Sequence, residues 1–132
     1  MDIEQARAYC LSFPHATENV QWGNDLVFKI AGKMFAVTVL ESASKYCLSF
    51  KCTEEKFAEL IEQEGIDPAP YSARYHWVAL ESFGALSEKE LKALLRNSYD
   101  LVFAKLPKKA RVDLEDKKTA RKTPQKLPLG AE

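Results

Sequence analysis

Few side chains in this sequence are of the types that catalyse reactions or hold metal ions. The two histidines, His15 and His76, have no cysteine or carboxylate partners at the spacing of a helical or hairpin metal site. The five glycines are scattered, so no phosphate-cradling loop is encoded, and no serine lies in a G-x-S-x-G turn. We therefore expect a protein that is not an enzyme and that has no cofactor and no metal.

The three cysteines, Cys10, Cys47 and Cys52, show no C-x-x-C spacing, and an odd number argues against a disulfide framework. Cys10 falls on the apolar stripe of a predicted helix and Cys47 in a predicted strand, which is typical of packing residues. Cys52 precedes the predicted helix N-cap Thr53, where the helix dipole could lower its pKa, but we expect it to be structural too. Free thiols fit a reducing compartment, and we expect a cytoplasmic protein.

Lysines that alternate with apolar residues provide the main chemical signal. In the predicted strands 26–30 and 45–51, one set of side chains is apolar and the other contains Lys29, Lys45 and Lys51. If the apolar set faces covering helices, these lysines share the opposite, open face of the sheet, where they could hold phosphate groups. The alternative is that they only solvate that face.

A segment restrained by Pro68 and Pro70 is the densest group of functional side chains. It contains Tyr71, Arg74, Tyr75, His76 and Trp77. If the strand that follows turns its apolar residues inward, Tyr75 and Trp77 join the lysine-bearing face, where rings could stack on bases or sugars. In the alternative interpretation, Tyr71 and Trp77 anchor the loop in the core and Arg74 pairs with an acid such as Glu81.

Apolar spacing and capping residues predict three helices and four or five strands. The helices cover residues 3–13, 54–64 and 88–102, capped by Asp2, Thr53 and Ser87; the strands cover residues 26–30, 34–40, 45–51 and about 75–82. Residues 15–25 are expected to form a polar connector and residues 66–70 an irregular segment. Short turns between strands require antiparallel pairing, so we expect an α+β fold, a two-layer α/β sandwich with helices on one face of an antiparallel sheet.

Charge is balanced in sum but not along the chain. The 132 residues carry 19 basic and 19 acidic side chains, of which nine basic and four acidic lie in residues 105–132. The predicted organisation is one domain, residues 1–106, followed by a basic, partly disordered C-terminal tail, residues 107–132, whose last dozen residues are mobile. A short helix from Pro107 toward Leu114 is only weakly indicated. No stretch approaches the ~18 apolar residues that span a bilayer, so we expect no membrane contact.

The order and spacing of several short motifs resemble the MmcQ/YjbR family, often described as double-wing DNA-binding proteins. The motifs are Trp22-Gly23, Phe28-Lys29-Ile30, Gly32 to Ala36, Pro70-Tyr71, His76-Trp77-Val78, Ser87 to Leu91, Ser98-Tyr99 and Leu101-Val102. The resemblance spans roughly residues 2–106. It implies an α-β(3)-α-β(2)-α fold similar to type III secretion chaperones, with no defined catalytic residues. Lys33, in a hairpin turn, would then lie at the tip of a wing.

Two functions follow as hypotheses. The first is a DNA-binding module that contacts mainly phosphate; its candidate residues are Lys29, Lys33, Lys45, Lys51, Arg74, His76, Trp77, Lys108 and Lys109. The second is an adaptor that binds a protein or peptide through an exposed sheet edge or an apolar groove, as the chaperone-like fold suggests. In either case we expect a monomer or a weak homodimer.

Overall fold

The computed structural model describes residues 1–41 and 43–121, with side chains up to Leu114. Its helices are α1 (Ile3–Leu11), α2 (Glu54–Leu60), α3 (Glu88–Ala104) and α4 (Lys108–Arg121), and its strands are β1 (Ala16–Gln21), β2 (Asp25–Ile30), β3 (Lys33–Val39), β4 (Leu48–Lys51), β5 (Ile66–Pro68) and β6 (Trp77–Leu80). The predicted caps are confirmed, because the side chains of Asp2, Thr53 and Ser87 each accept a hydrogen bond from a backbone N–H in the first turn of the helix that follows.

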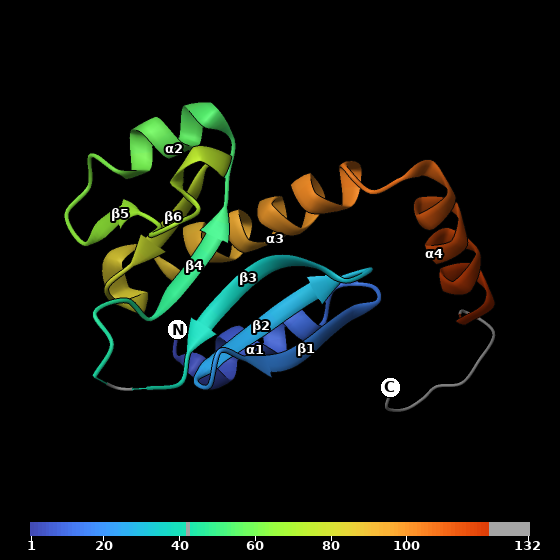
Figure 1. Ribbon diagram of the computed structural model, residues 1–132, viewed down its shortest axis with the longest axis horizontal. Coiled ribbons are helices and arrows are strands. Elements are labelled where there is room, and N and C mark those ends of the chain that lie inside the picture. The colour runs from blue at the N-terminus through green and yellow to red at the C-terminus, as the bar shows by residue number, and fades with distance from the viewer. Residues whose placement is uncertain (42, 122–132) are drawn as a thin grey trace.

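The six strands form one open antiparallel sheet in the order β1-β2-β3-β4-β6-β5. Helices α1 and α3 lie behind this sheet in Figure 1, and none of the helices of the described residues covers its front. The main core fills the space between, where Phe28, Phe35 and Phe50 from the sheet are fully buried together with Leu91 and Leu95 of α3. The predicted α+β fold, with helices on one face of an antiparallel sheet, is confirmed.

Strand β1 corrects the predicted element order, because four strands, not three, precede α2. We expected residues 15–25 to form a polar connector. Glu18 occupies a helix-facing position of β1 that would normally be apolar, and Arg7 of α1 donates two hydrogen bonds to its carboxylate, at 2.8 and 2.6 Å. An ion pair therefore replaces the hydrophobic alternation by which strands are recognised.

Strand β5 is the second correction, since residues 66–70 were expected to be irregular. Ile66 is fully buried opposite Leu80, and Pro68 lies at the end of this short outer strand. Proline is tolerated there because the strand has a neighbour on one side only. Strand β4 and helix α2 are also shorter than predicted, beginning at Leu48 and ending at Leu60.

The β2–β3 hairpin turns through Ala31 and Gly32, with left-handed φ angles of 51° and 80°. Such a two-residue turn matches the twist of the strands it joins. A β-bulge follows, because Phe28 pairs with Ala36 while Lys29 pairs with Met34, so that Phe35 is an extra residue. Phe35 and Ala36 both pack in the main core as a result.

Helix α3 is fastened to the sheet by the buried hydroxyl of Ser98. Its Oγ donates to the carbonyl of Phe35 in β3, at 2.6 Å, and accepts from the backbone N–H of Lys51 in β4, at 2.9 Å. The β3–β4 pairing ends just before this point, at Ala36 and Phe50. The serine therefore replaces a ladder hydrogen bond where the two strands separate.

Helix α4 is longer than the short segment indicated by the sequence, and it reaches Arg121. Its side chains Ala110 and Leu114 are partly buried against the main core. The predicted mobility of the last dozen residues concerns residues 122–132, which lie outside the described part of the chain.

We predict that Ser98→Ala lowers the free energy of unfolding by about 2–4 kcal/mol, because it leaves one buried N–H and one buried C=O without a partner. Urea-induced unfolding measures this loss. Asn97→Ala, a change in the same helix at a half-buried side chain, should stay within about 0.5 kcal/mol of the parent protein. A loss below about 1 kcal/mol for Ser98→Ala would contradict the bridging role.

Candidate nucleic-acid interface

The front face of the sheet does not form the predicted lysine platform. Lys29 and Lys51 do lie on this face, opposite Met34 and Trp77 respectively. Between and around them, however, Trp77 packs with Ala69 and Ala79, and Met34, Val37 and Tyr46 pack against this group. Because the Trp77 side chain is only 8% exposed, its ring supports the fold and offers little surface for stacking on a base.

Lys45 is separated from the other predicted lysines. It precedes β4, at the opposite end of that strand from Lys51, and its Nζ lies 3.9 Å from the Asp67 carboxylate and 5.3 Å from the centre of the Tyr46 ring. The pKa of Lys45 is raised, first by Tyr46 and then by Asp67 and Glu81. Its charge is therefore shared with local acids and does not join a phosphate-binding surface.

The remaining predicted cations lie toward the same end of the strands. Because neighbouring strands run in opposite directions, β2 ends where β3 begins, and β4 ends where β6 begins. Lys29 and Lys33 flank the hairpin turn, Lys51 is the last residue of β4, and Arg74 and His76 lead into β6. They therefore share an end of the strands, in two groups, because β3 and β4 separate beyond Ala36 and Phe50.

Helix α3 adds a second group of cations at this end. Tyr99 donates from its hydroxyl to the carbonyl of Pro14, at 2.6 Å, and the strand that follows Pro14 starts opposite Ile30, beside the hairpin turn. The last turn of α3 therefore extends toward the hairpin, as Figure 1 shows, and Lys105, Lys108 and Lys109 follow it. Burial lowers the pKa of Lys51, and the positive charge of Lys105 lowers it further.

We call this surface the basic end; it consists of Lys29, Lys33, Lys51, Arg74, Lys105, Lys108 and Lys109. In residues 1–41 and 43–114, no carboxylate forms an ion pair with any of these seven side chains. The nearest acids along the chain from Lys51 are Glu54 and Glu55, in the first turn of α2. Lys105 was not among the predicted site residues. Its position depends on where α3 ends and how the chain turns into α4, which the sequence alone does not show.

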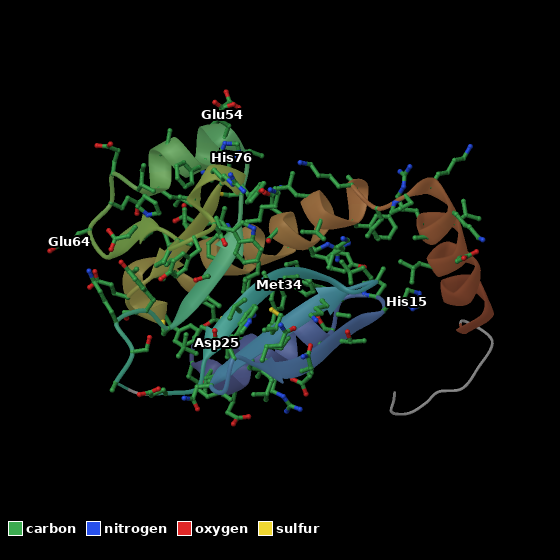
Figure 2. The ribbon with its side chains drawn as sticks, in the orientation of Figure 1. His15, Asp25, Met34, Glu54, Glu64 and His76 are labelled. Carbon is green, nitrogen blue, oxygen red and sulfur yellow. The ribbon has the colours of Figure 1, made fainter. Side chains whose placement is uncertain are left out.

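The opposite end of the sheet is acidic. Its acids are Asp25, Glu41, Glu62, Glu64, Asp67 and Glu81, which flank the other ends of the strands. The backbone N–H of Glu81 donates to the carbonyl of Gly65, which brings two of these segments together. In Figure 2, Asp25 and Glu64 lie away from His15, which precedes the start of β1 at the basic end. Most of the charge is thus separated along the strand direction, while Glu54 and Glu55 lie at the basic end, where Figure 2 shows Glu54 near His76.

Of the alternative interpretation of the loop before β6, the anchoring by Trp77 is confirmed, whereas Tyr71 is not buried and, among the described residues, no ion pair joins Arg74 to Glu81. Tyr71 is fully exposed, and Arg74 lies over the ring of Tyr75, with 4.9 Å between the guanidinium carbon and the ring centre. His76 is half-buried in a left-handed conformation and packs edge-on against Phe57, at 5.6 Å between ring centres. The His76 side chain therefore packs against α2 and supports this loop, while the Arg74 side chain is exposed to solvent.

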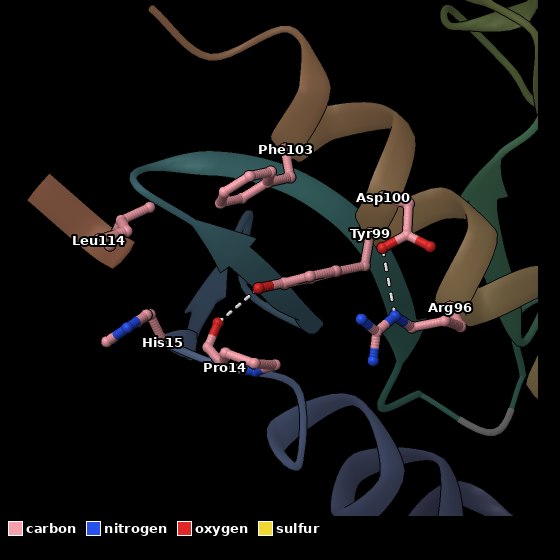
Figure 3. A pocket seen from close by; sticks show the side chains of 7 residues that line it. All are labelled: Pro14, His15, Arg96, Tyr99, Asp100, Phe103 and Leu114. Atoms are coloured by element: carbon pink, nitrogen blue, oxygen red, sulfur yellow. Dashed lines mark hydrogen bonds and ion pairs between the residues drawn. The ribbon is translucent and has the colours of Figure 1, made fainter. Parts of the chain in front are cut away.

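A small pocket of about 190 Å³ lies beside the basic end (Figure 3). Its lining residues are Pro14, His15, Arg96, Tyr99, Asp100, Phe103 and Leu114. The guanidinium of Arg96 pairs with Asp100 at 3.1 Å and lies 5.3 Å from the ring centres of both Phe13 and Tyr99. Because its cation is already paired, the pocket is better suited to seating Leu114 of α4 than to holding an anion.

The thiols are in environments that keep them protonated. Burial raises the pKa of Cys10 to about 12 and that of Cys52 to about 11, so at Cys52 burial outweighs the positive charges of Lys51 and Lys56. The Sγ of Cys52 donates to the carbonyl of His76, at 3.3 Å. Among the described residues, no three His, Cys, Asp or Glu side chains are grouped as a metal site would require. No helix in this part of the chain is long and apolar enough to cross a membrane.

An α+β domain with an open six-stranded sheet and a cationic strand end has clear relatives. The YjbR family model matches residues 11–101, and the chain therefore belongs to the YjbR family, as its motifs suggested. The structure of the Deinococcus radiodurans protein DR2400, a DUF419 domain, is similar at a TM-score of 0.76 and 30% identity, over 86% of this chain and 87% of that one.

A second solved structure, of a protein from Pseudomonas syringae, shares the fold. Its TM-score is 0.64 at 22% identity, over 76% of this chain and 98% of the other. A comparison with curated proteins found no match. The relatives therefore establish the family and the fold, and what the basic end binds has to be argued from its own chemistry.

We predict that Cys10 and Cys52 of the native protein react with Ellman's reagent at about pH 8 at least roughly 100-fold more slowly than after unfolding, because their raised pKa values suppress the thiolate. Cys47, which is only half-buried, should react first. The same reaction is measured on Cys47→Ser, in which Cys10 and Cys52 are the remaining thiols. Equal rates in the folded and unfolded protein would contradict this picture.

Proposed function

We propose that this YjbR family protein is a non-enzymatic DNA-binding protein that contacts mainly phosphate groups through its basic end. The observation that carries the proposal is that seven cations without ion-pair partners, from four separate parts of the described chain, lie toward one end of the sheet. Lysine and arginine side chains that have no carboxylate partner are free to neutralise phosphates and release counterions.

The acidic end of the sheet favours one orientation of the protein on DNA. Residues 1–104 carry ten basic and fifteen acidic side chains, so this part of the chain as a whole repels a polyanion. With the charges separated along the strands, however, approach through the basic end is favourable and approach through the acidic end is not. Binding should therefore depend on close contacts and weaken steeply with salt.

The alternative, a peptide-binding groove on the open sheet face, has less support. Ala79 and Val27 of that face are fully buried and Trp77 is nearly so, so the centre of the face is already covered by its own side chains. The exposed large apolar residues of the described chain are also dispersed. Val20, Trp22 and Leu40 lie toward the acidic end, Tyr71 and Tyr75 in the loop before β6, and Val112 in α4.

We predict that the triple variant Lys105→Gln, Lys108→Gln, Lys109→Gln binds labelled duplex DNA roughly 10- to 100-fold more weakly than the parent protein at low salt. Each lost phosphate contact should also reduce the slope of log K against log salt by about 0.9. Fluorescence anisotropy at several salt concentrations measures both quantities.

Lys45→Gln is the control for position, because it removes one positive charge at the acidic end, from a lysine already paired with Asp67; the single variant Lys105→Gln is its match in charge. Lys45→Gln should leave DNA affinity and salt slope unchanged. The proposal fails if the parent protein does not bind DNA even at low salt, or if Lys45→Gln weakens binding as much as Lys105→Gln does.

A further inference from the structure

Two tyrosines stand next to the cations of the basic end, and from them we infer that the preferred ligand is an unpaired DNA strand whose bases stack on Tyr71 and Tyr75. This inference rests on the proposed function, because it names the form of DNA that the same site takes. Tyr71 is fully exposed and Tyr75 is 53% exposed, in a loop where Pro70 and Arg74 are exposed as well. Their rings are available to a ligand without any rearrangement of the core.

Backbone hydrogen bonds hold the loop that carries these rings in one conformation. The N–H of Ala69 donates to the carbonyl of Trp77 at 2.9 Å, and the N–H groups of Tyr75 and Trp77 both donate to the carbonyl of Ser72, at 3.1 and 3.4 Å. Pro68 and Pro70 restrict the backbone further. Two rings on a restrained loop lose little conformational freedom when a ligand binds, which favours affinity.

Cations are placed directly around Tyr75. Lys51 donates from its Nζ to the Tyr75 carbonyl, at 2.7 Å, and the guanidinium of Arg74 lies 4.9 Å from the ring centre. A base that stacks on the exposed part of this ring would therefore have its own phosphate within reach of two positive charges. Aromatic rings interleaved with cations are the usual composition of surfaces that bind single strands.

An undistorted duplex offers these rings no base face. Its bases are already stacked on one another, so a protein reaches base edges and phosphates unless it unstacks a base step, at a cost of about a few kcal/mol. An unpaired strand exposes the base faces, and stacking on tyrosine adds to the phosphate contacts without requiring a particular sequence. The exposed tyrosines thus distinguish a single-strand site from a purely cationic one.

The test compares three labelled ligands of about 12 nucleotides, a length within the range of known single-strand sites. They are an oligo-dT strand, a blunt duplex and an abasic strand with the same number of phosphates, and fluorescence anisotropy at low salt gives each affinity. The protein variants are Tyr71→Ala, Tyr75→Ala and the double variant. Trp22→Ala is the matched control, because it removes an aromatic ring that is 68% exposed at the acidic end.

We expect oligo-dT to bind more tightly than the duplex or the abasic strand. Each tyrosine variant should weaken oligo-dT binding roughly 5- to 50-fold and leave abasic-strand binding nearly unchanged. Trp22→Ala should change neither. Thermal unfolding checks that each variant is folded; if Tyr75→Ala is not, Tyr71→Ala decides, since that side chain is fully exposed.

Equal binding of oligo-dT and the abasic strand, or tyrosine variants that bind oligo-dT like the parent, would overturn the stacking inference and leave phosphate binding intact. Failure of the protein to bind any of the three ligands would instead remove the proposed function, and the inference with it. The two failures are therefore distinguishable in a single set of titrations.

Discussion

The arrangement of this protein depends on how α3 packs on the sheet, and one buried hydroxyl fixes the position of the helix. Ser98 satisfies a carbonyl of β3 and an N–H of β4 at the place where those strands separate. A buried backbone group without a partner is costly, so α3 is confined to the position in which the serine meets both. From there Tyr99 reaches the carbonyl of Pro14, which fixes the entry into β1 relative to the same helix.

These contacts also determine where positive charge collects. The direction of α3 carries Lys105 and the beginning of α4 toward the end of the sheet that already holds Lys33 and Lys51. Lysines far apart in the sequence therefore lie toward the same end of the molecule. Because acids occupy the other end, the same packing that builds the core produces a molecule with oppositely charged ends.

Elements with a regular apolar period were predictable from the sequence, and those built on polar pairing were not. The spacing of Leu91, Leu94 and Leu95 indicates α3, and alternation indicates β2. In β1, by contrast, Glu18 faces the helix layer and is tolerated only because Arg7, eleven residues earlier, meets it. No local pattern reveals a pair of that kind, and an outer strand of mostly polar residues resembles a loop.

The residues of the candidate site, too, were predictable only in part. Alternation correctly placed Lys29 and Lys51 on the face away from the helices, but it could not show that Trp77 would be packed there by Met34 and Val37. Nor could it show that Lys45 would pair with Asp67, because that contact joins segments across three strands of the sheet. Residue type was enough to identify most of the cations of the basic end. Only the topology shows which of them lie toward the same end of the sheet.

The bulge at Phe35 links the interior to the hairpin tip. It lets one strand contribute two consecutive side chains to the core, and the Phe35 ring contacts those of Phe13 and Tyr99. Bulges also increase the local twist of a strand, so the direction in which the tip projects is set by the ring that the core must accommodate. Relatives with a smaller residue at this position could aim an identical tip differently, and diverge in what they recognise without any change on the surface.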